Sequence, residues 1–233
     1  MGAISDHWVI AARVSIVHQC FDGADMLNDE ERARALRFIN RKDTERYLAA
    51  HLLKRRLLAD ATGQPPQLLQ FGRHAGGKPY LVGDEAPDFS ISHGGNWVTA
   101  GLSWTGCIGV DVEADRLTNF WDEIASFFLT PAELVNMEGQ EFLKLWTAKE
   151  AALKAHGAGL AILPNAITVT DNRAGFALQI DKMNANGQWR RLDEMHMLAV
   201  ATSGQPPQVA ICHSADDLLI TLENVKLPFV ETD

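Results

Sequence analysis

Residues 44–63, TERYLAAHLLKRRLLADATG, place leucines three and four positions apart, and Gly63 followed by two prolines closes the segment. This period predicts a long amphipathic helix with one buried face. Further along, DFSISHGGNWVTAGLSW turns at Gly94 and Gly95 between two alternating runs, which predicts a β-hairpin. The first half of the chain is therefore expected to pack a helix on a sheet.

The second half loosely repeats this pattern. A later helix, LWTAKEAALKAHGAGL, spaces its aromatic and charged residues as the first helix does, and each helix is followed by a proline and a strand-like run. We expect an α+β fold of two similar subdomains related by pseudo-twofold symmetry, with the active site at their interface. The expected units are 1–106, 107–225 and a peripheral tail at 226–233, with HMLAVATSGQPPQVAICH as a hairpin closing the second unit.

The N-terminal region is expected to contain a strand over residues 8–17 and a helix that begins near Asn28 and Asp29. It lacks the basic segment of a secretory signal, and no membrane-spanning stretch is visible. Three dispersed cysteines favour neither a zinc site nor a disulfide framework. These features predict a cytoplasmic protein, and one chain could build the interface site as a monomer.

Charge is unevenly distributed along the chain. The 233 residues carry a net charge of −9, yet residues 31–56 hold nine Lys/Arg against three Asp/Glu, a local +6. The overall charge argues against a nucleic-acid binder. The basic segment itself has two interpretations, a solvated helix face or a site for phosphates or an acidic partner.

The stretch GVDVE places two carboxylates on one face of a predicted strand. Asp111 and Glu113 are two residues apart, so their Cα atoms lie roughly 7 Å from each other and the side chains can converge. Mg²⁺ prefers a few carboxylates together with substrate phosphates and water. The alternative is a half-exposed strand that turns its acidic residues to solvent.

Other polar residues are ambiguous when taken singly. Glu150 and Lys154 lie one helical turn apart and could be an ordinary solvent ion pair. Ser92 and His93 are neighbours on a strand, so they point to opposite faces and cannot easily form a nucleophile and base. His93 could instead donate a hydrogen bond to a phosphate or be a satisfied structural histidine. Lys78 in GGKP is either simply exposed or held by the turn in position for an anion.

The order of these motifs is more informative than any one of them. A basic helix with Arg46, then GKP, SISH, GVDVE, FFLTPAE and WTAKEAALK resembles the 4′-phosphopantetheinyl transferases of the Sfp type, over residues 31–160. The resemblance implies a holo-[acyl-carrier-protein] synthase type of enzyme. Such enzymes transfer the 4′-phosphopantetheine of coenzyme A to a serine of an acyl or peptidyl carrier protein and release adenosine 3′,5′-bisphosphate.

The resemblance also implies roles for individual residues. Asp111, Glu113 and Glu150 would bind Mg²⁺ with the coenzyme A pyrophosphate. Glu150 would also take the serine proton, directly or through a metal-bound water, and Lys154 would stabilise the phosphate charge. The residues expected to contact coenzyme A are Arg34, Arg46, Lys78, Ser92 and His93. The acceptor would be an acidic helical carrier domain, which the basic segment could steer to the site.

Two positions depart from the family pattern. Glu31 stands where a basic residue can occur near the coenzyme A phosphates, and Ala158 stands where many relatives have lysine. The rival hypotheses are a catalytically idle relative that only binds coenzyme A or a carrier, a Mg²⁺-dependent nuclease or phosphatase, and nucleic-acid binding by the basic helix.

Overall fold

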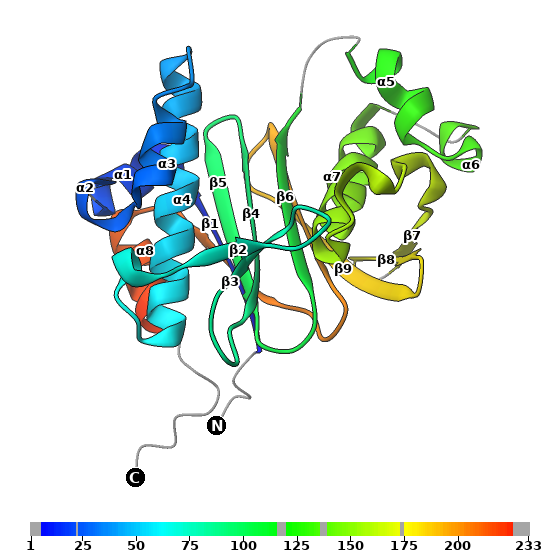
Figure 1. Cartoon of the computed structure of the whole chain (residues 1–233). Coiled ribbons are helices and arrows are strands. Elements are labelled where there is room, and N and C mark those ends of the chain that lie inside the picture. Colours follow the sequence, from blue (N-terminus) through cyan, green and yellow to red (C-terminus); the bar gives the residue numbers. More distant parts are fainter. Residues whose placement is uncertain (1–5, 22, 116–119, 136–138, 173–174, 226–233) are drawn as a thin grey trace.

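The computed structural model describes residues 6–21, 23–115, 120–135, 139–172 and 175–225. Within them the chain forms two lobes, each a β-sheet covered by one long helix, and the lobes stand side by side with a gap between their upper ends (Figure 1). The expected α+β class with two helix-and-sheet units is confirmed. The expected tail, 226–233, lies outside the described residues.

The first lobe is built on a four-stranded sheet in the order β11-β1-β5-β4. Its long helix is α4, and a short hairpin of two strands, β2 and β3, extends toward the second lobe (Figure 1). The elements are β1 (His7–Arg13), α1 (Val14–Cys20), α2 (Gly23–Met26), α3 (Asp29–Ala35), α4 (Arg41–Thr62), a 3-10 turn (Pro66–Leu68), β2 (Phe71–Arg73), β3 (Pro79–Leu81), β4 (Asp88–Gly94), β5 (Trp97–Ser103), β11 (Gln208–Cys212) and α8 (Ala215–Glu223).

Helix α4 begins and ends at the residues that its sequence favours. The Asn40 side chain accepts a hydrogen bond from the Lys42 backbone N–H, and Gly63 ends the helix with a φ of 68°. An amide oxygen at the N-cap satisfies a free backbone donor, and glycine adopts the left-handed conformation without a steric penalty. The predicted helix over 44–63 is therefore confirmed, with a start three residues earlier.

The second lobe is a five-stranded sheet in the order β6-β10-β9-β8-β7, against which α7 packs. The elements are β6 (Ile108–Ala114), α5 (Phe120–Phe128), α6 (Pro131–Val135), α7 (Gly139–His156), two 3-10 turns (Gly159–Ala161 and Pro164–Ala166), β7 (Val169–Asn172), β8 (Gly175–Ile180), β9 (Met183–Arg191) and β10 (His196–Thr202).

The two sheets meet where β4 faces β6, and side chains rather than backbone ladders join them. Asp88, Ser90 and Ser92 alternate along β4 and accept hydrogen bonds from the backbone N–H groups of Ile108, Val110 and Val112, at 2.8, 3.1 and 3.3 Å. Because strand side chains repeat every two residues, one face of β4 supplies all three acceptors. An apolar core between the sheets adds to this contact; it includes Val9, Trp97, Val110, Val112, Leu198 and Val200.

The predicted strand over 8–17 is wrong in its second half. The strand ends at Arg13, and Val14–Cys20 forms helix α1, although valine and isoleucine favour strands. Ile16 and Val17 are buried in the core of the first lobe, and α1 packs against α4 and α8. Tertiary burial of one helical face thus overrides the local preference.

The predicted closing hairpin is also wrong. Strand β10 lies in the second sheet, whereas β11 crosses to the first sheet and pairs in parallel with β1. Helix α8 follows it and buries Leu218 and Leu222 in the core of the first lobe. Residues 208–225 therefore belong with the first lobe and not with the expected 107–225 unit.

Candidate active site

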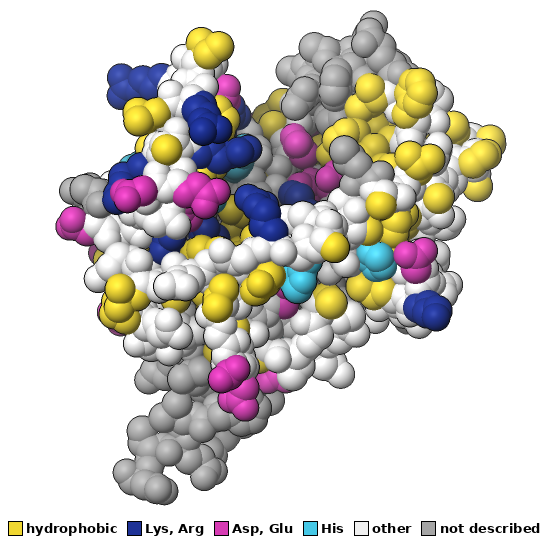
Figure 2. Space-filling model, viewed as in Figure 1, with side chains coloured by type: hydrophobic (Ala, Val, Ile, Leu, Met, Phe, Trp, Pro, Cys, Tyr) yellow, Lys and Arg dark blue, Asp and Glu magenta, His cyan; other side chains and the backbone are white. Residues whose placement is uncertain are grey.

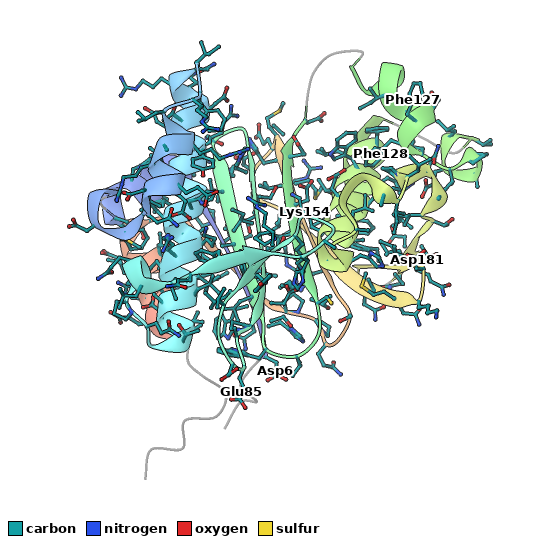
Figure 3. The ribbon with its side chains drawn as sticks, viewed as in Figure 1. Asp6, Glu85, Phe127, Phe128, Lys154 and Asp181 are labelled. Atoms are coloured by element: carbon teal, nitrogen blue, oxygen red, sulfur yellow. The ribbon has the colours of Figure 1, made fainter. Side chains whose placement is uncertain are left out.

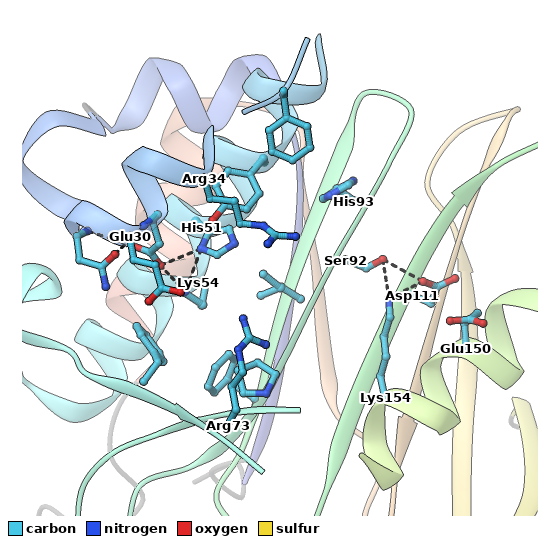
Figure 4. Close-up of a pocket in the computed structure, with 18 of the residues that line it drawn as sticks. Glu30, Arg34, His51, Lys54, Arg73, Ser92, His93, Asp111, Glu150 and Lys154 are labelled. Atoms are coloured by element: carbon cyan, nitrogen blue, oxygen red, sulfur yellow. Dashed lines mark hydrogen bonds and ion pairs between the residues drawn. The ribbon is translucent and has the colours of Figure 1, made fainter. Parts of the chain in front are cut away.

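A cleft of about 710 Å³ lies between the lobes. Helices α3 and α4 and the β2–β3 hairpin form one wall, and β6 and α7 form the other (Figure 4). Among the residues expected at the site, seven line this cleft: Arg34, Ser92, His93, Asp111, Glu113, Glu150 and Lys154.

Asp111 is the best-buried carboxylate of the second wall, with 4% of its surface exposed. Its Oδ1 accepts hydrogen bonds from the Ser92 hydroxyl at 3.0 Å and the Lys154 ammonium at 2.7 Å. Its Oδ2 is buried and has no hydrogen-bond donor within the described ranges of the chain. A buried carboxylate oxygen without a donor is energetically costly, so this atom is suited to a ligand that the protein itself does not supply.

Glu150 and Lys154 come from successive turns of α7 and face the same end of the cleft (Figure 4). Burial and the nearby Asp111 carboxylate raise the pKa of Glu150, and Lys154 partly opposes this shift. The Lys154 ammonium also donates to Ser92 Oγ at 3.0 Å. The site thus joins β4, β6 and α7 through one hydrogen-bonded group.

The carboxylates fit a hard dication. Across the residues that the structure describes, no three His, Cys, Asp or Glu side chains are already gathered into a finished metal centre. The free Oδ2 of Asp111, the half-buried Glu113 on the same strand and the repulsion between Asp111 and Glu150 nevertheless form an oxygen-rich set that a cation would stabilise.

The opposite wall, here called the cationic wall, carries three cations together with the carboxylates of Glu30 and Glu31. Arg34, Lys54 and Arg73 line it, and Figure 4 shows them across the cleft from Asp111 and Glu150. Arg73 donates to the Gly77 carbonyl at 3.1 Å and remains exposed. Lys54 and Arg73 were not expected at the site from the sequence. Arg73 lies five residues before the lysine of GKP, and this closeness to a predicted anion-binding turn was the available signal.

Glu31 is a buried structural residue, 6% exposed, beneath this wall. Its Oε1 accepts from His51 and Lys54 at 2.8 and 2.6 Å, and its Oε2 accepts from Arg55 at 2.6 Å. Burial alone would raise the pKa of Glu31, but the hydrogen bond from His51 and the charges of Lys54 and Arg55 outweigh burial and lower it. Burial lowers the pKa of Lys54 to about 8 despite Glu31. Glu31, the acidic residue that departs from the family pattern, thus neutralises the buried cations Lys54 and Arg55.

Two expected coenzyme A contacts lie outside the cleft lining. The Lys78 ammonium bonds to Asp88 Oδ2 at 2.5 Å and to the carbonyls of Ile108 and Ala155, each at 3.2 Å, so its three donors are all used. Arg46 pairs with Asp43 and donates to the Gly95 carbonyl at 3.3 Å. Lys78 ties the β2–β3 hairpin to β6 and α7.

Parts of the WTAKEAALK and FFLTPAE motifs have structural roles. Lys149 is fully buried and donates to Glu133 Oε2 at 2.5 Å and to the Phe128 carbonyl at 3.0 Å. Trp146 stacks on Phe128 with ring centroids 4.0 Å apart. These contacts fix α7 against α5 and α6 and so position Glu150 and Lys154.

Comparison with known proteins places this chain in one family. A sequence model described as the N-terminal region of 4′-phosphopantetheinyl transferase matches residues 16–103, and one described as the 4′-phosphopantetheinyl transferase superfamily matches residues 107–212. A Synechocystis sp. protein classed by name as a 4′-phosphopantetheinyl transferase is 35% identical over 202 residues, which cover 83% of this chain and 81% of the relative.

Two further relatives match shorter stretches. The 4′-phosphopantetheinyl transferase HetI of Nostoc sp. is 34% identical over 62% of this chain and 65% of the relative. The 4′-phosphopantetheinyl transferase of Bacillus subtilis is 31% identical over 57% of this chain and 61% of the relative. This chain spans slightly less than two thirds of each of these two.

The α+β fold with an interlobe cleft is thus that of a two-lobed transferase. The chain belongs to the 4′-phosphopantetheinyl transferase superfamily, in its Sfp-type branch, and is a phosphopantetheinyl transferase. Of the described helices, none combines the length and hydropathy that crossing a bilayer requires.

Proposed function

We propose that this enzyme transfers 4′-phosphopantetheine from coenzyme A to a serine hydroxyl of an acyl or peptidyl carrier protein, in a Mg²⁺-dependent reaction. The observation that carries the proposal is the two-sided cleft, which has a volume of about 710 Å³. Its cationic wall faces its carboxylate wall. A nucleotide with several phosphates requires cations for its charge, while a metal-assisted displacement at phosphorus requires carboxylates.

The cationic wall would hold the phosphates of coenzyme A. Arg34 and Arg73 can each present a planar pair of donors to a phosphate, and Lys54 adds a charge behind them. Ser92 and His93 on β4 lie between the walls and supply hydrogen-bond donors. Arg46 could join them only by leaving its contact with Asp43.

The carboxylate wall would hold Mg²⁺. Asp111 offers its donor-free Oδ2, and Glu113 and Glu150 flank it in the cleft. When bound, the ion would neutralise the pyrophosphate and so lower the cost of charge building up on the leaving group.

The chain's own groups account for the proton and the charge. As the serine oxygen forms its bond to the β-phosphorus, the bond to the adenosine 3′,5′-bisphosphate oxygen breaks and the serine proton passes to Glu150. Glu150 lines the cleft one helical turn from Lys154, so its carboxylate can accept this proton directly or through a water. Lys154, already hydrogen bonded to Ser92 and Asp111, places a fixed positive charge beside the reacting phosphate.

A direct assay tests this function. The protein is incubated with coenzyme A, Mg²⁺ and several unrelated apo carrier proteins, and each carrier is weighed by mass spectrometry. We expect a gain of one phosphopantetheine, lost when Mg²⁺ is chelated and restored by adding it back. An unchanged mass on every carrier would leave an idle binding relative, and inorganic phosphate release or nucleic-acid cleavage without a carrier would favour the nuclease or phosphatase alternative.

A further inference from the structure

The turn between α3 and α4 exposes an unusual run of apolar side chains. We call residues 36–42 the α3–α4 knuckle. Ile39 is 104% exposed, Leu36 is 86% exposed and Phe38 is 37% exposed. Single exposed apolar residues are common on protein surfaces, but three within four positions form a patch that favours contact with another molecule.

The backbone holds this patch in a defined shape. The N–H groups of Arg37 and Phe38 donate to the carbonyls of Arg34 and Ala35 at 3.1 and 3.4 Å. Asn40 then caps α4. Because the turn is fixed at both ends, it loses little conformational entropy when its side chains bind a partner.

The knuckle is also strongly basic. Residues 36–42 contain three Lys/Arg and no Asp/Glu, on a chain whose net charge is −9. Arg41 pairs with Glu45 at 2.8 Å, whereas Arg37 and Lys42 make no ion pair within the part of the chain that the structure describes. Figure 2 shows basic and apolar side chains gathered at the upper end of the α3 and α4 side. An acidic surface would be attracted here and repelled by most of the remaining protein.

The knuckle adjoins the cleft mouth. Phe38 belongs to both, since it lines the cleft and packs on Tyr47 with ring centroids 5.3 Å apart. A folded domain of about 60 residues has a radius of gyration of about 10 Å, so it cannot enter a cleft of about 710 Å³. A domain that delivers a serine to Glu150 must therefore rest on the rim of the cleft.

The opposite rim lacks this charge. On α5 and α6, Phe127 and Val135 are 77% and 84% exposed, but residues 120–135 contain three Asp/Glu and no Lys or Arg. Figure 3 shows Phe127 on the far side of the gap from the first lobe. An acidic partner has apolar surface on both rims but complementary charge only on the knuckle.

We propose that the α3–α4 knuckle is the docking surface for the acidic helical carrier domain, with Leu36 and Ile39 as apolar contacts and Arg37 and Lys42 as steering charges. This inference rests on the proposed function, since it assigns the acceptor's position on the same site. Electrostatic complementarity at a rim mainly raises the association rate and makes it salt-dependent.

The test measures docking apart from chemistry. The probe is an acyl carrier protein whose acceptor serine is replaced by alanine, and its Kd is measured by fluorescence anisotropy with coenzyme A and Mg²⁺ present. The test variants are Arg37→Glu with Lys42→Glu, and Leu36→Ser with Ile39→Ser. The matched control is Lys182→Glu with Arg190→Glu, two exposed cations of the second lobe.

We expect each knuckle variant to weaken carrier binding about tenfold or more, with the charge-reversed variant also losing most of the salt dependence. The control should bind within about twofold of wild type. The KM for coenzyme A should not change in any of them, because none of the substituted residues lines the cleft. All substituted positions are exposed, so thermal unfolding should match wild type.

Several results would overturn the inference. Wild-type affinity in both knuckle variants would do so, as would weakened binding in Phe127→Ser alone. Binding of the knuckle to phosphatidylserine vesicles, or self-association seen by light scattering, in place of carrier binding would also contradict it. If the wild type modifies a carrier but the knuckle variants behave normally, only the docking assignment fails; if the wild type modifies none, the proposed function fails as well.

Discussion

Helices α4 and α7 each place a lysine beside a buried carboxylate, Lys54 beside Glu31 and Lys154 beside Asp111. The two carboxylates differ in how many hydrogen bonds their oxygens accept. Each oxygen of Glu31 accepts two hydrogen bonds. Oε1 accepts them from His51 and Lys54, and Oε2 accepts them from Arg55 and the Asn28 backbone N–H. Asp111 accepts two at Oδ1 and none at Oδ2 from the chain as described. The Glu31 group is thus complete, and the Asp111 group has capacity left for a ligand.

This difference separates a structural charge cluster from a catalytic one. Position in the sequence does not separate the two clusters, because both lysines lie on long helices that pack against a sheet. A completed cluster should affect stability when it is broken, whereas an incomplete one should affect chemistry. Each substitution below tests one side of this contrast.

The largest expected effect is on turnover, from Asp111→Ala. Because this change removes the donor-free oxygen and the partner of Lys154, we expect kcat/KM for carrier modification to fall about 10³-fold or more. Glu150→Gln should reduce it similarly through loss of the base. Near-normal turnover in Asp111→Ala would contradict the metal and catalytic assignments.

The same two variants should remain folded. Glu150→Gln removes a repulsion with Asp111, so without added Mg²⁺ its unfolding temperature should equal or exceed that of wild type. Circular dichroism melting curves check this. A large loss of stability would mean that the Asp111 group is structural like that of Glu31.

Glu31→Gln should mainly reduce stability. It leaves Lys54 and Arg55 buried without their counter-charge, which costs about 3–5 kcal/mol in the free energy of unfolding. Urea denaturation at neutral pH measures it. The matched control is Glu30→Gln, an exposed neighbour on the same helix, which should change stability by about 0.5 kcal/mol or less.

The stability gap between wild type and Glu31→Gln should depend on pH. The folded-state pKa of Glu31 is lowered, so its contribution is fully present above the unfolded value of about 4.3 and is lost as the pH falls below it. Urea curves between pH 3 and 7, below the pKa of about 8 of Lys54, should show the gap narrowing as the pH falls below about 4.3. A gap that widened on acidification would contradict the lowered pKa.

The smallest expected effect comes from Lys78→Met. Because its ammonium already bonds Asp88 and two backbone carbonyls, we expect a loss of about 2 kcal/mol in stability and only a modest rise in the KM for coenzyme A. Arg73→Met is the matched control, since it should raise that KM with little loss of stability. The reverse pattern would make Lys78 a direct coenzyme A contact.

Local sequence patterns predicted a large part of the fold and of the site. The leucine period and Gly63 located α4, Asn28 located the start of α3, and the alternation of GVDVE placed Asp111 and Glu113 on one strand of the cleft. Each of these depends on neighbours within a few residues. The order of short motifs then indicated the family, which the comparisons confirm.

Other features depended on partners far apart in the chain. The crossing of β11 to the first sheet and the helical form of Val14–Cys20 are set by packing within the first lobe, and the saturation of Lys78 by its contacts with the second. Glu31, expected only as a departure from the family pattern, is buried among cations, and Arg73, not expected at the site, lines the cleft.

The sequence by itself thus determined the two long helices and the strands that carry the site motifs, where the main helix is capped, and which motifs a transferase of this family brings together. Only the tertiary structure decided which charges are used up in the interior and which remain free in the cleft. The physical reason is that helix periods and caps are local energies, whereas the desolvation and pairing of a buried charge depend on every element packed around it.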